Sequence, residues 1–238
     1  MLSRPVTVTV RALSDMFRIH DVGELPVVIQ PDPIWHDPVS ERATTDAAWR
    51  VFTRVNLVDR GRLHGHALDV LHLLARPSVE YVGVVLGQDY QDGVVVAARG
   101  DEAVIAYRTG AAVTLTSVRH ASLPETLLRQ IPDVRPAVVD AINVRVDDIA
   151  ARTEGASAIR DSHTLRLLKR QRLLGQGELY VAIRDAYGRR RRSGPIRYQD
   201  YRIGRVVVVI ADGYLSVAPA TKVLLRDRLR TVHQALAE

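Results

Sequence analysis

The run EYVGVVLG (Glu80–Gly87) leads through the polar turn QDYQDG (Gln88–Gly93) into three further apolar runs, and this series closes on a helical segment, Leu123–Ile131. The second half repeats the order: ELYVAIRD (Glu178–Asp185) leads through the basic turn GRRRR (Gly188–Arg192) into more apolar runs and a long terminal helix. Because the strands follow one another through short turns and do not alternate with helices, the pattern predicts antiparallel meanders and an α+β fold.

The matching halves also indicate the domain organisation. A chain of 238 residues can form one large domain or two small ones. Since both halves have the same order of elements, we expect one merged domain over residues 1–238, with half-repeats at approximately 1–132 and 133–238. Helices placed before and after each meander would cover the sheet.

The composition is that of an ordinary soluble globular protein, with 47% hydrophobic and 25% charged residues and a net charge of +6. The lack of cysteine excludes disulfides, thiol catalysis and cysteine metal sites. The first residues lack the apolar core of a signal peptide, and no apolar run approaches the roughly 18 residues that span a bilayer. We therefore expect a cytoplasmic protein without stable membrane insertion. The positive charge would favour an acidic partner or nucleic acid.

Local periodicity predicts the elements of the first half that precede the meander. We expect strands at Val6–Val10 and Leu25–Ile29, separated by a short helix, and a proline-rich loop at Gln30–Pro38. Two helices, one through Ala48–Val55 and one through Leu68–Ala75, would form a hairpin ahead of the sheet.

In the second half we expect a helix over Ala137–Arg152, a flexible break at Glu154–Ala158 and a further helix over roughly Ser162–Leu174. A helix pair would then precede the second sheet as it does the first. At the end of the first half, Ser122 and Glu125 have the spacing of a capping box at the start of the helix Leu123–Ile131.

No residue pattern predicts an enzyme, a metal site or a cofactor. His64, His66 and His72 are close in the sequence, but they form neither an i, i+4 helical pair nor an HExxH motif. The chain has no phosphate-cradling glycine loop, no GxSxG elbow and no obvious Ser–His–Asp set. The run Arg189–Arg192 is of a size that contacts phosphates, although a solvated hairpin turn explains it without any partner.

The turn made by Gln88, Asp89, Tyr90, Gln91 and Asp92 is the other feature of interest. Its composition predicts an exposed loop, yet it contains a tyrosine, a residue type enriched at protein interfaces. Taken alone, the pattern is typical of a hairpin tip with an incidental aromatic residue.

Five segments, in order along nearly the whole chain, resemble motifs of the EspG family. They are AWRVFTRVNLVDRGRL (Ala48–Leu63), LARPSVE (Leu74–Glu80), AIRDAYGRRRRS (Ala182–Ser193), IGRVVVV (Ile203–Val209) and YLSVAPATKVLLRDRL (Tyr214–Leu229). EspG proteins are cytosolic chaperones of actinobacterial type VII secretion. The resemblance implies a central, strongly twisted antiparallel sheet, helical bundles on its sides and a pseudo-two-fold relation between the halves.

The resemblance also implies a partner and a binding surface. EspG proteins bind secreted PE–PPE helical heterodimers at the apolar tip of the PPE protein, and this role needs no catalytic residues. Their substrate-facing loop corresponds here to Gln88–Asp92, which makes Tyr90 a candidate contact, and further contacts are expected in the segment Ala137–Leu174. The free protein is expected to be a monomer, or a weak homodimer formed through apolar strand edges.

Two other functions are kept as alternatives. A basic regulatory or nucleic-acid-binding protein would use Arg189–Arg192, and its affinity for DNA or RNA would fall with salt. An enzyme of unrecognised type would show a deep pocket with convergent polar groups. The leading expectation is a secretion chaperone that binds no nucleic acid.

Overall fold

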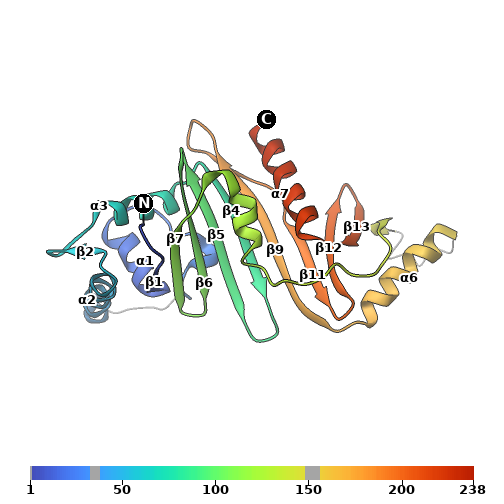
Figure 1. Ribbon diagram of the computed structural model, residues 1–238, viewed down its shortest axis with the longest axis horizontal. Helices are drawn as coiled ribbons and strands as arrows, with labels where there is room; N and C mark the ends of the chain where they lie inside the picture. The colour runs from blue at the N-terminus through green and yellow to red at the C-terminus, as the bar shows by residue number, and fades with distance from the viewer. Residues whose placement is uncertain (1, 33–37, 148–155) are drawn as a thin grey trace.

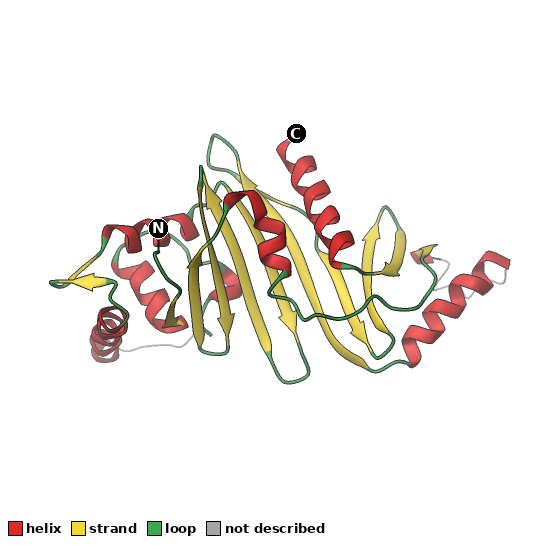
Figure 2. Cartoon of the chain, viewed as in Figure 1, coloured by secondary structure: helices red, strands yellow, loops and turns green. Residues whose placement is uncertain are grey.

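The computed structural model describes residues 2–32, 38–147 and 156–238, which form an α+β fold built on one large antiparallel sheet (Figures 1 and 2). The strands of the first half are β1 (Val6–Thr9), β4 (Val79–Leu86), β5 (Gln91–Arg99), β6 (Glu102–Thr109) and β7 (Ala112–Ser117). Those of the second half are β8 (Ile142–Arg145), β9 (Leu173–Arg184), β10 (Arg190–Arg192), β11 (Ile196–Tyr201), β12 (Gly204–Ala211) and β13 (Tyr214–Pro219). The predicted α+β class is confirmed.

Strands β4 and β9 form the centre of the sheet. They pair antiparallel from Val79 opposite Ile183 to Leu86 opposite Gln176. Outward from β4 lie β5, β6, β7 and β1, and outward from β9 lie β11, β12, β13 and β8, while β10 pairs with the end of β9. Most side chains of β4, β5 and β6 are buried on both faces of the sheet, and these strands therefore appear in the sequence as nearly continuous apolar runs.

One face of the central strands is covered by two helices that follow the meanders (Figure 1). These helices are α4 (Leu123–Leu128) and α7 (Lys222–Ala237). Gly83 of β4 allows α4 to pack closely, because a Cβ atom there would lie 3.2 Å from the side chains of both Leu127 and Leu179. The terminal helix α7 is buried against the sheet at Leu225 and Leu229.

The opposite face is covered at its two ends by different helices (Figure 2). At the β1 end lie α1 (Val10–Ile19), the 3-10 helix η1 (Val27–Ile29), α2 (Pro38–Arg54) and α3 (Gly65–Ala75), with a small hairpin of β2 (Val58–Asp59) and β3 (Arg62–Leu63) between α2 and α3. At the β8 end lies α6 (Ala156–Arg170). The two helices predicted ahead of the first meander are confirmed.

Near the N-terminus, one predicted strand is confirmed and one is wrong. Val6–Val10 contains β1, although Val10 already belongs to α1. Leu25–Ile29 forms no strand, because the chain turns through η1 and packs across β5. A Cβ atom at Gly93 would overlap the carbonyl group of Val28, so this crossing needs glycine. In the predicted loop Gln30–Pro38, residues 33–37 lie outside the described residues.

The helix predicted over Ala137–Arg152 is wrong over residues 137–145. These residues are not helical and lead into β8, which pairs with β13. Val146 and Asp147 are helical, and residues 148–152 lie outside the described part of the chain. The preceding backbone is bonded to β12: Arg205 N donates to the Arg135 carbonyl at 2.7 Å, and Ala137 N donates to the Arg205 carbonyl at 2.9 Å. These tertiary hydrogen bonds override the helical spacing of the apolar residues.

The helix predicted over Ser162–Leu174 ends earlier than expected. Helix α6 ends at Arg170, and β9 begins at Leu173, five residues before the predicted strand start at Glu178. Within the described residues, β8 and α6 precede the second meander, and two helical residues, Val146 and Asp147, lie between them. Of the predicted break Glu154–Ala158, residues 156–158 belong to α6 and the first two lie outside the described residues.

The predicted capping box at the start of α4 is also wrong. The Ser122 side chain makes no cap hydrogen bond, and its hydroxyl donates instead to the Arg119 carbonyl at 3.4 Å. Glu125 accepts from Arg230 Nη2 at 2.6 Å. The carboxylate therefore ties α4 to α7 and does not cap its own helix.

A buried ion pair fixes the start of β12. The Arg205 guanidinium donates from Nε to Asp200 Oδ1 at 2.6 Å and from Nη2 to Asp200 Oδ2 at 2.8 Å. Its central carbon lies 4.2 Å from the centroid of the Tyr198 ring, and the Arg205 side chain is only 1% exposed. Two-point pairing of this kind orients both groups. It fixes the residue whose backbone bonds to Arg135 and Ala137 ahead of β8.

We expect Asp200→Ala to lower the free energy of unfolding by about 3–5 kcal/mol, because it leaves the Arg205 guanidinium buried and unpaired. Glu178→Ala is the control, since it removes the half-exposed pair with Arg197 and should cost less than about 1 kcal/mol. Urea unfolding of both variants measures the difference. Equal losses would show that the buried pair has no special role.

Candidate functional site

The predicted contact loop lies at the turn between β4 and β5. Gly87 N donates to the Tyr90 carbonyl at 2.9 Å and closes the turn. Gln88, Asp89 and Tyr90 form the exposed tip, whereas Gln91 and Asp92 already belong to β5. Gln91 is exposed as well, so four of the five predicted residues are accessible to a partner.

Asp92 is the exception, because it is buried. Its side chain faces the same side of the sheet as α4 and α7, and its Oδ2 accepts a hydrogen bond from the Tyr107 hydroxyl at 2.6 Å. Burial raises the pKa of Tyr107, and the hydrogen bond to Asp92 raises it further. Asp92 therefore supports the loop from below and does not present a surface to a partner.

Tyr90 is held in place although it is half exposed. Its ring lies against the backbone of Gly87, where any Cβ atom would overlap it. About half of the residue, 48%, remains exposed to solvent. A fixed and accessible aromatic ring loses little conformational entropy when it is covered by a partner.

Two leucines at the start of β9 lie at the same end of the central strand pair. Leu173 and Leu174 are 38% and 36% exposed, and the register that pairs Leu86 with Gln176 extends towards them. Nearby, Arg172 Nη2 donates to Gln88 Oε1 at 3.0 Å. We call Gln88–Gln91 together with Leu173 and Leu174 the hairpin-end patch.

The sequence did not identify these leucines as surface residues. Their spacing continued the predicted helix Ser162–Leu174, and only the pairing of β9 with β4 places them beside the loop. The signal that was available is the pair of glycines that follows, Gly175 and Gly177, because glycine disfavours a helix.

The arginine run is largely engaged within the protein. Arg189 Nε bonds to Asp185 at 2.8 Å and Arg190 Nε to Glu80 at 2.5 Å, while the Arg192 guanidinium lies 4.9 Å from the centroid of the Tyr180 ring. Part of the run forms β10 and pairs with β9, and all four arginines are exposed, in agreement with the expected solvated hairpin. A run engaged in this way leaves few guanidinium groups free to bind phosphates one by one.

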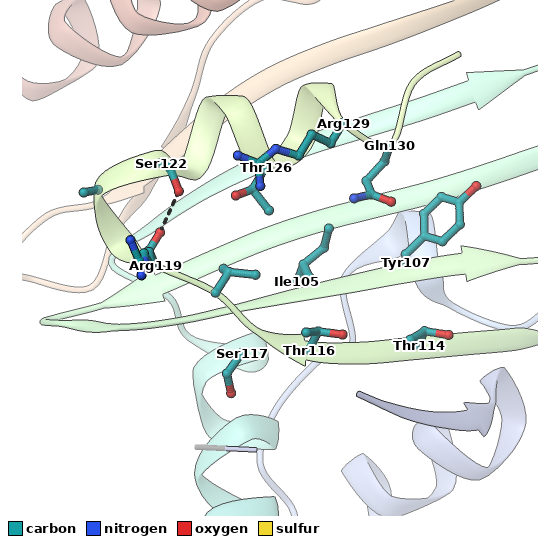
Figure 3. A pocket seen from close by; sticks show the side chains of 12 residues that line it. Ile105, Tyr107, Thr114, Thr116, Ser117, Arg119, Ser122, Thr126, Arg129 and Gln130 are labelled. Carbon is teal, nitrogen blue, oxygen red and sulfur yellow. Dashed lines mark hydrogen bonds between the residues drawn. The ribbon is translucent and has the colours of Figure 1, made fainter. Parts of the chain in front are cut away.

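An open groove of about 1000 Å³ lies between α4 and strands β6 and β7 (Figure 3). Hydroxyl groups and two arginines dominate its lining: Ile105, Tyr107, Thr114, Thr116, Ser117, Val118, Arg119, Ala121, Ser122, Thr126, Arg129 and Gln130. None of these side chains is a carboxylate, an imidazole or a thiol. The groove therefore presents no ordinary general base and no strong metal ligand.

The three histidines that are close in the sequence do not form one cluster. The rings of His64 and His66 stack at a centroid distance of 5.2 Å, while the His72 carbonyl accepts from Arg99 Nη2 at 2.7 Å. Over residues 2–32, 38–147 and 156–238, no three His, Cys, Asp or Glu side chains are grouped so that they could hold a metal ion. Among the helices of these same ranges, none combines the length and apolarity that crossing a membrane requires.

We expect Tyr107→Phe to destabilise the protein by about 1–3 kcal/mol, because it removes the hydroxyl that donates to Asp92 Oδ2 and leaves that buried oxygen without this partner. Tyr214→Phe is the matched control at an exposed tyrosine and should change stability by less than about 0.5 kcal/mol. Thermal and urea unfolding measure both. If the Tyr107→Phe variant were as stable as the native chain, the loop would not depend on this hydrogen bond.

Comparison with known proteins adds to this geometry. The sequence profile of the EspG family matches residues 9–231. No curated protein matches the chain. Among solved structures, the fold is similar to that of the Mycobacterium tuberculosis type VII secretion system chaperone EspG5, which was determined in complex with a PE25–PPE41 dimer. The TM-score is 0.70 and the sequence identity is 18%. The match covers 96% of this chain and 95% of EspG5. Since the profile covers nearly the whole sequence, this chain belongs to the EspG family.

Proposed function

We propose that this chain is a cytoplasmic chaperone of type VII secretion that binds a PE–PPE heterodimer or a similar secreted helical protein. The family match over residues 9–231 is the observation that carries this proposal. The likeness to EspG5, whose structure contains a PE25–PPE41 dimer, supports the same class of partner. The chaperone has no catalytic role, and the lining of its groove supplies no group that would suggest one.

The hairpin-end patch is the proposed contact surface. An apolar tip on a secreted helical bundle is an aggregation risk until it is covered. Tyr90, Leu173 and Leu174 offer apolar area, and exposed Gln88, Asp89 and Gln91 supply hydrogen bonds around it. An apolar centre with a polar rim is the usual anatomy of a protein interface.

The two halves form one domain in this proposal, with matching half-repeats at 1–132 and 133–238 related by a pseudo-two-fold axis. Two observations support it. Outward from the centre, each half has three meander strands and an edge strand from its own N-terminal part, β1 or β8. Each meander also ends in a helix, α4 or α7, on the same face. The patch then lies where the halves meet, because β4 and β5 belong to one and β9 to the other.

The test is co-expression with the PE–PPE pair encoded beside its gene, followed by size-exclusion chromatography and calorimetry. We expect a 1:1:1 complex. Tyr90→Ala should weaken binding by roughly 10–30-fold, as expected for a tyrosine at the centre of an interface. Tyr214→Ala, at a similarly exposed tyrosine of β13, is the matched control and should bind like the native chain.

The outcomes separate the parts of the proposal. A complex that tolerates Tyr90→Ala would contradict the contact surface but not the chaperone role. If no neighbouring PE–PPE pair binds, the partner class is wrong. The free chain is expected to elute as a monomer or as a weak homodimer, since β1 and β8 each leave one strand edge unpaired within the described sheet.

A further inference from the structure

The turn that joins β9 to β10 lies at the other end of the central strand pair from the hairpin-end patch. Leu86 and Gln176 mark the patch end of the β4–β9 pairing, and Val79 and Ile183 mark the turn end. Seven residue steps separate these ends, which is about 23 Å along a strand. Figure 1 shows this turn projecting past the ends of the neighbouring strands. A partner at the turn and a cargo at the patch would not compete for the same surface.

Asp185 holds the turn in one conformation. Its Oδ1 accepts from the backbone N–H groups of Tyr187 and Arg189, each at 2.9 Å, and its Oδ2 accepts from Arg189 Nε at 2.8 Å. The Asp185 carbonyl accepts from Gly188 N at 2.9 Å, and Arg184 Nη1 donates to the Gly188 carbonyl at 3.0 Å. The turn is therefore ordered before any partner arrives, which lowers the entropic cost of binding.

Tyr187 stands at the tip of this turn and is 85% exposed, more than any other large apolar residue in the described part of the chain. The guanidinium carbon of Arg189 lies 5.3 Å from the centroid of its ring, and this contact limits where the ring can point. Tyrosine and arginine are the residue types most often found at the energetic centres of protein interfaces.

The charge around the tyrosine is strongly positive. Five arginines and one aspartate lie between positions 184 and 192, and Glu80 neutralises one of those arginines. Arg191 is exposed, and its side chain makes no ion pair or hydrogen bond with any described residue. An acidic surface would complement this charge and speed the encounter.

We propose that residues Asp185–Arg192 form a second docking surface, for an acidic protein surface with an apolar depression that receives the Tyr187 ring. A protein is favoured over nucleic acid because three of the four consecutive arginines are engaged within the chain. Few guanidinium groups are left to follow a row of phosphates, whereas one exposed tyrosine beside one unengaged arginine suits a protein interface. The surface stays free when the hairpin-end patch is occupied, so the protein can hold a cargo and a second protein together.

The test uses fluorescence anisotropy with two labelled probes, a short glutamate-rich peptide that contains leucines and a single-stranded oligonucleotide of the same net charge. We expect the peptide to bind more tightly than the oligonucleotide. Tyr187→Ala and Arg191→Ala should each lower the affinity for the peptide by at least roughly 5-fold. Arg62→Ala, which removes one exposed arginine from β3, and Tyr214→Ala are the matched controls and should retain the native affinity.

Three results would overturn the proposal. The first is absence of peptide binding, and the second is an equal loss with Arg62→Ala, which would show attraction to net charge alone. The third is tighter binding of the oligonucleotide with the same sensitivity to Tyr187 and Arg191, which would identify a nucleic-acid site. Circular dichroism confirms that each variant is folded. The Tyr187→Ala variant should bind the PE–PPE cargo like the native chain. A negative result with the acidic peptide would therefore leave the proposed chaperone role intact.

Discussion

The antiparallel pairing of β4 with β9 is the constraint on which the rest of this structure depends. It joins the two meanders into a single sheet and removes two long strand edges that would otherwise be open to aggregation. The contacts of the covering helices with the sheet and with each other depend on the same pairing. The Tyr81 hydroxyl of β4 lies 2.7 Å from His233 Nδ1 of α7, and Glu125 of α4 bonds to Arg230 of α7.

The register of that pairing also decides where the functional surfaces lie. It places the β4–β5 turn beside the first residues of β9, so that an aromatic residue from one half and two leucines from the other form one patch. The same register carries the β9–β10 turn to the far end of the pair. A slip by one residue would exchange the faces of β9 and expose its core side chains. Folding stability and surface arrangement are thus set by the same hydrogen bonds.

The parts of the fold that depend on local signals were predictable from the sequence. Consecutive apolar runs separated by polar turns predicted the meanders, and apolar spacing predicted the helices at Ala48–Val55 and Leu68–Ala75. The errors arose where tertiary contacts decide. Val138 and Ile142 have helical spacing, but the hydrogen bond from Ala137 to Arg205 and the pairing of Ile142 with β13 keep residues 137–145 out of a helix. Likewise, no local signal shows that Asp92 is buried beneath Tyr107 while its neighbour Gln91 is exposed.

Amide hydrogen exchange on the free chain and on its complex with a PE–PPE pair would test the central claim most directly. The account predicts new protection at residues 87–91 and 172–175, on both sides of the β4–β9 seam, and unchanged exchange in the β9–β10 turn. New protection confined to the α1–α3 end of the sheet or to the β9–β10 turn would contradict it, because the cargo would then bind away from the place where the two halves meet.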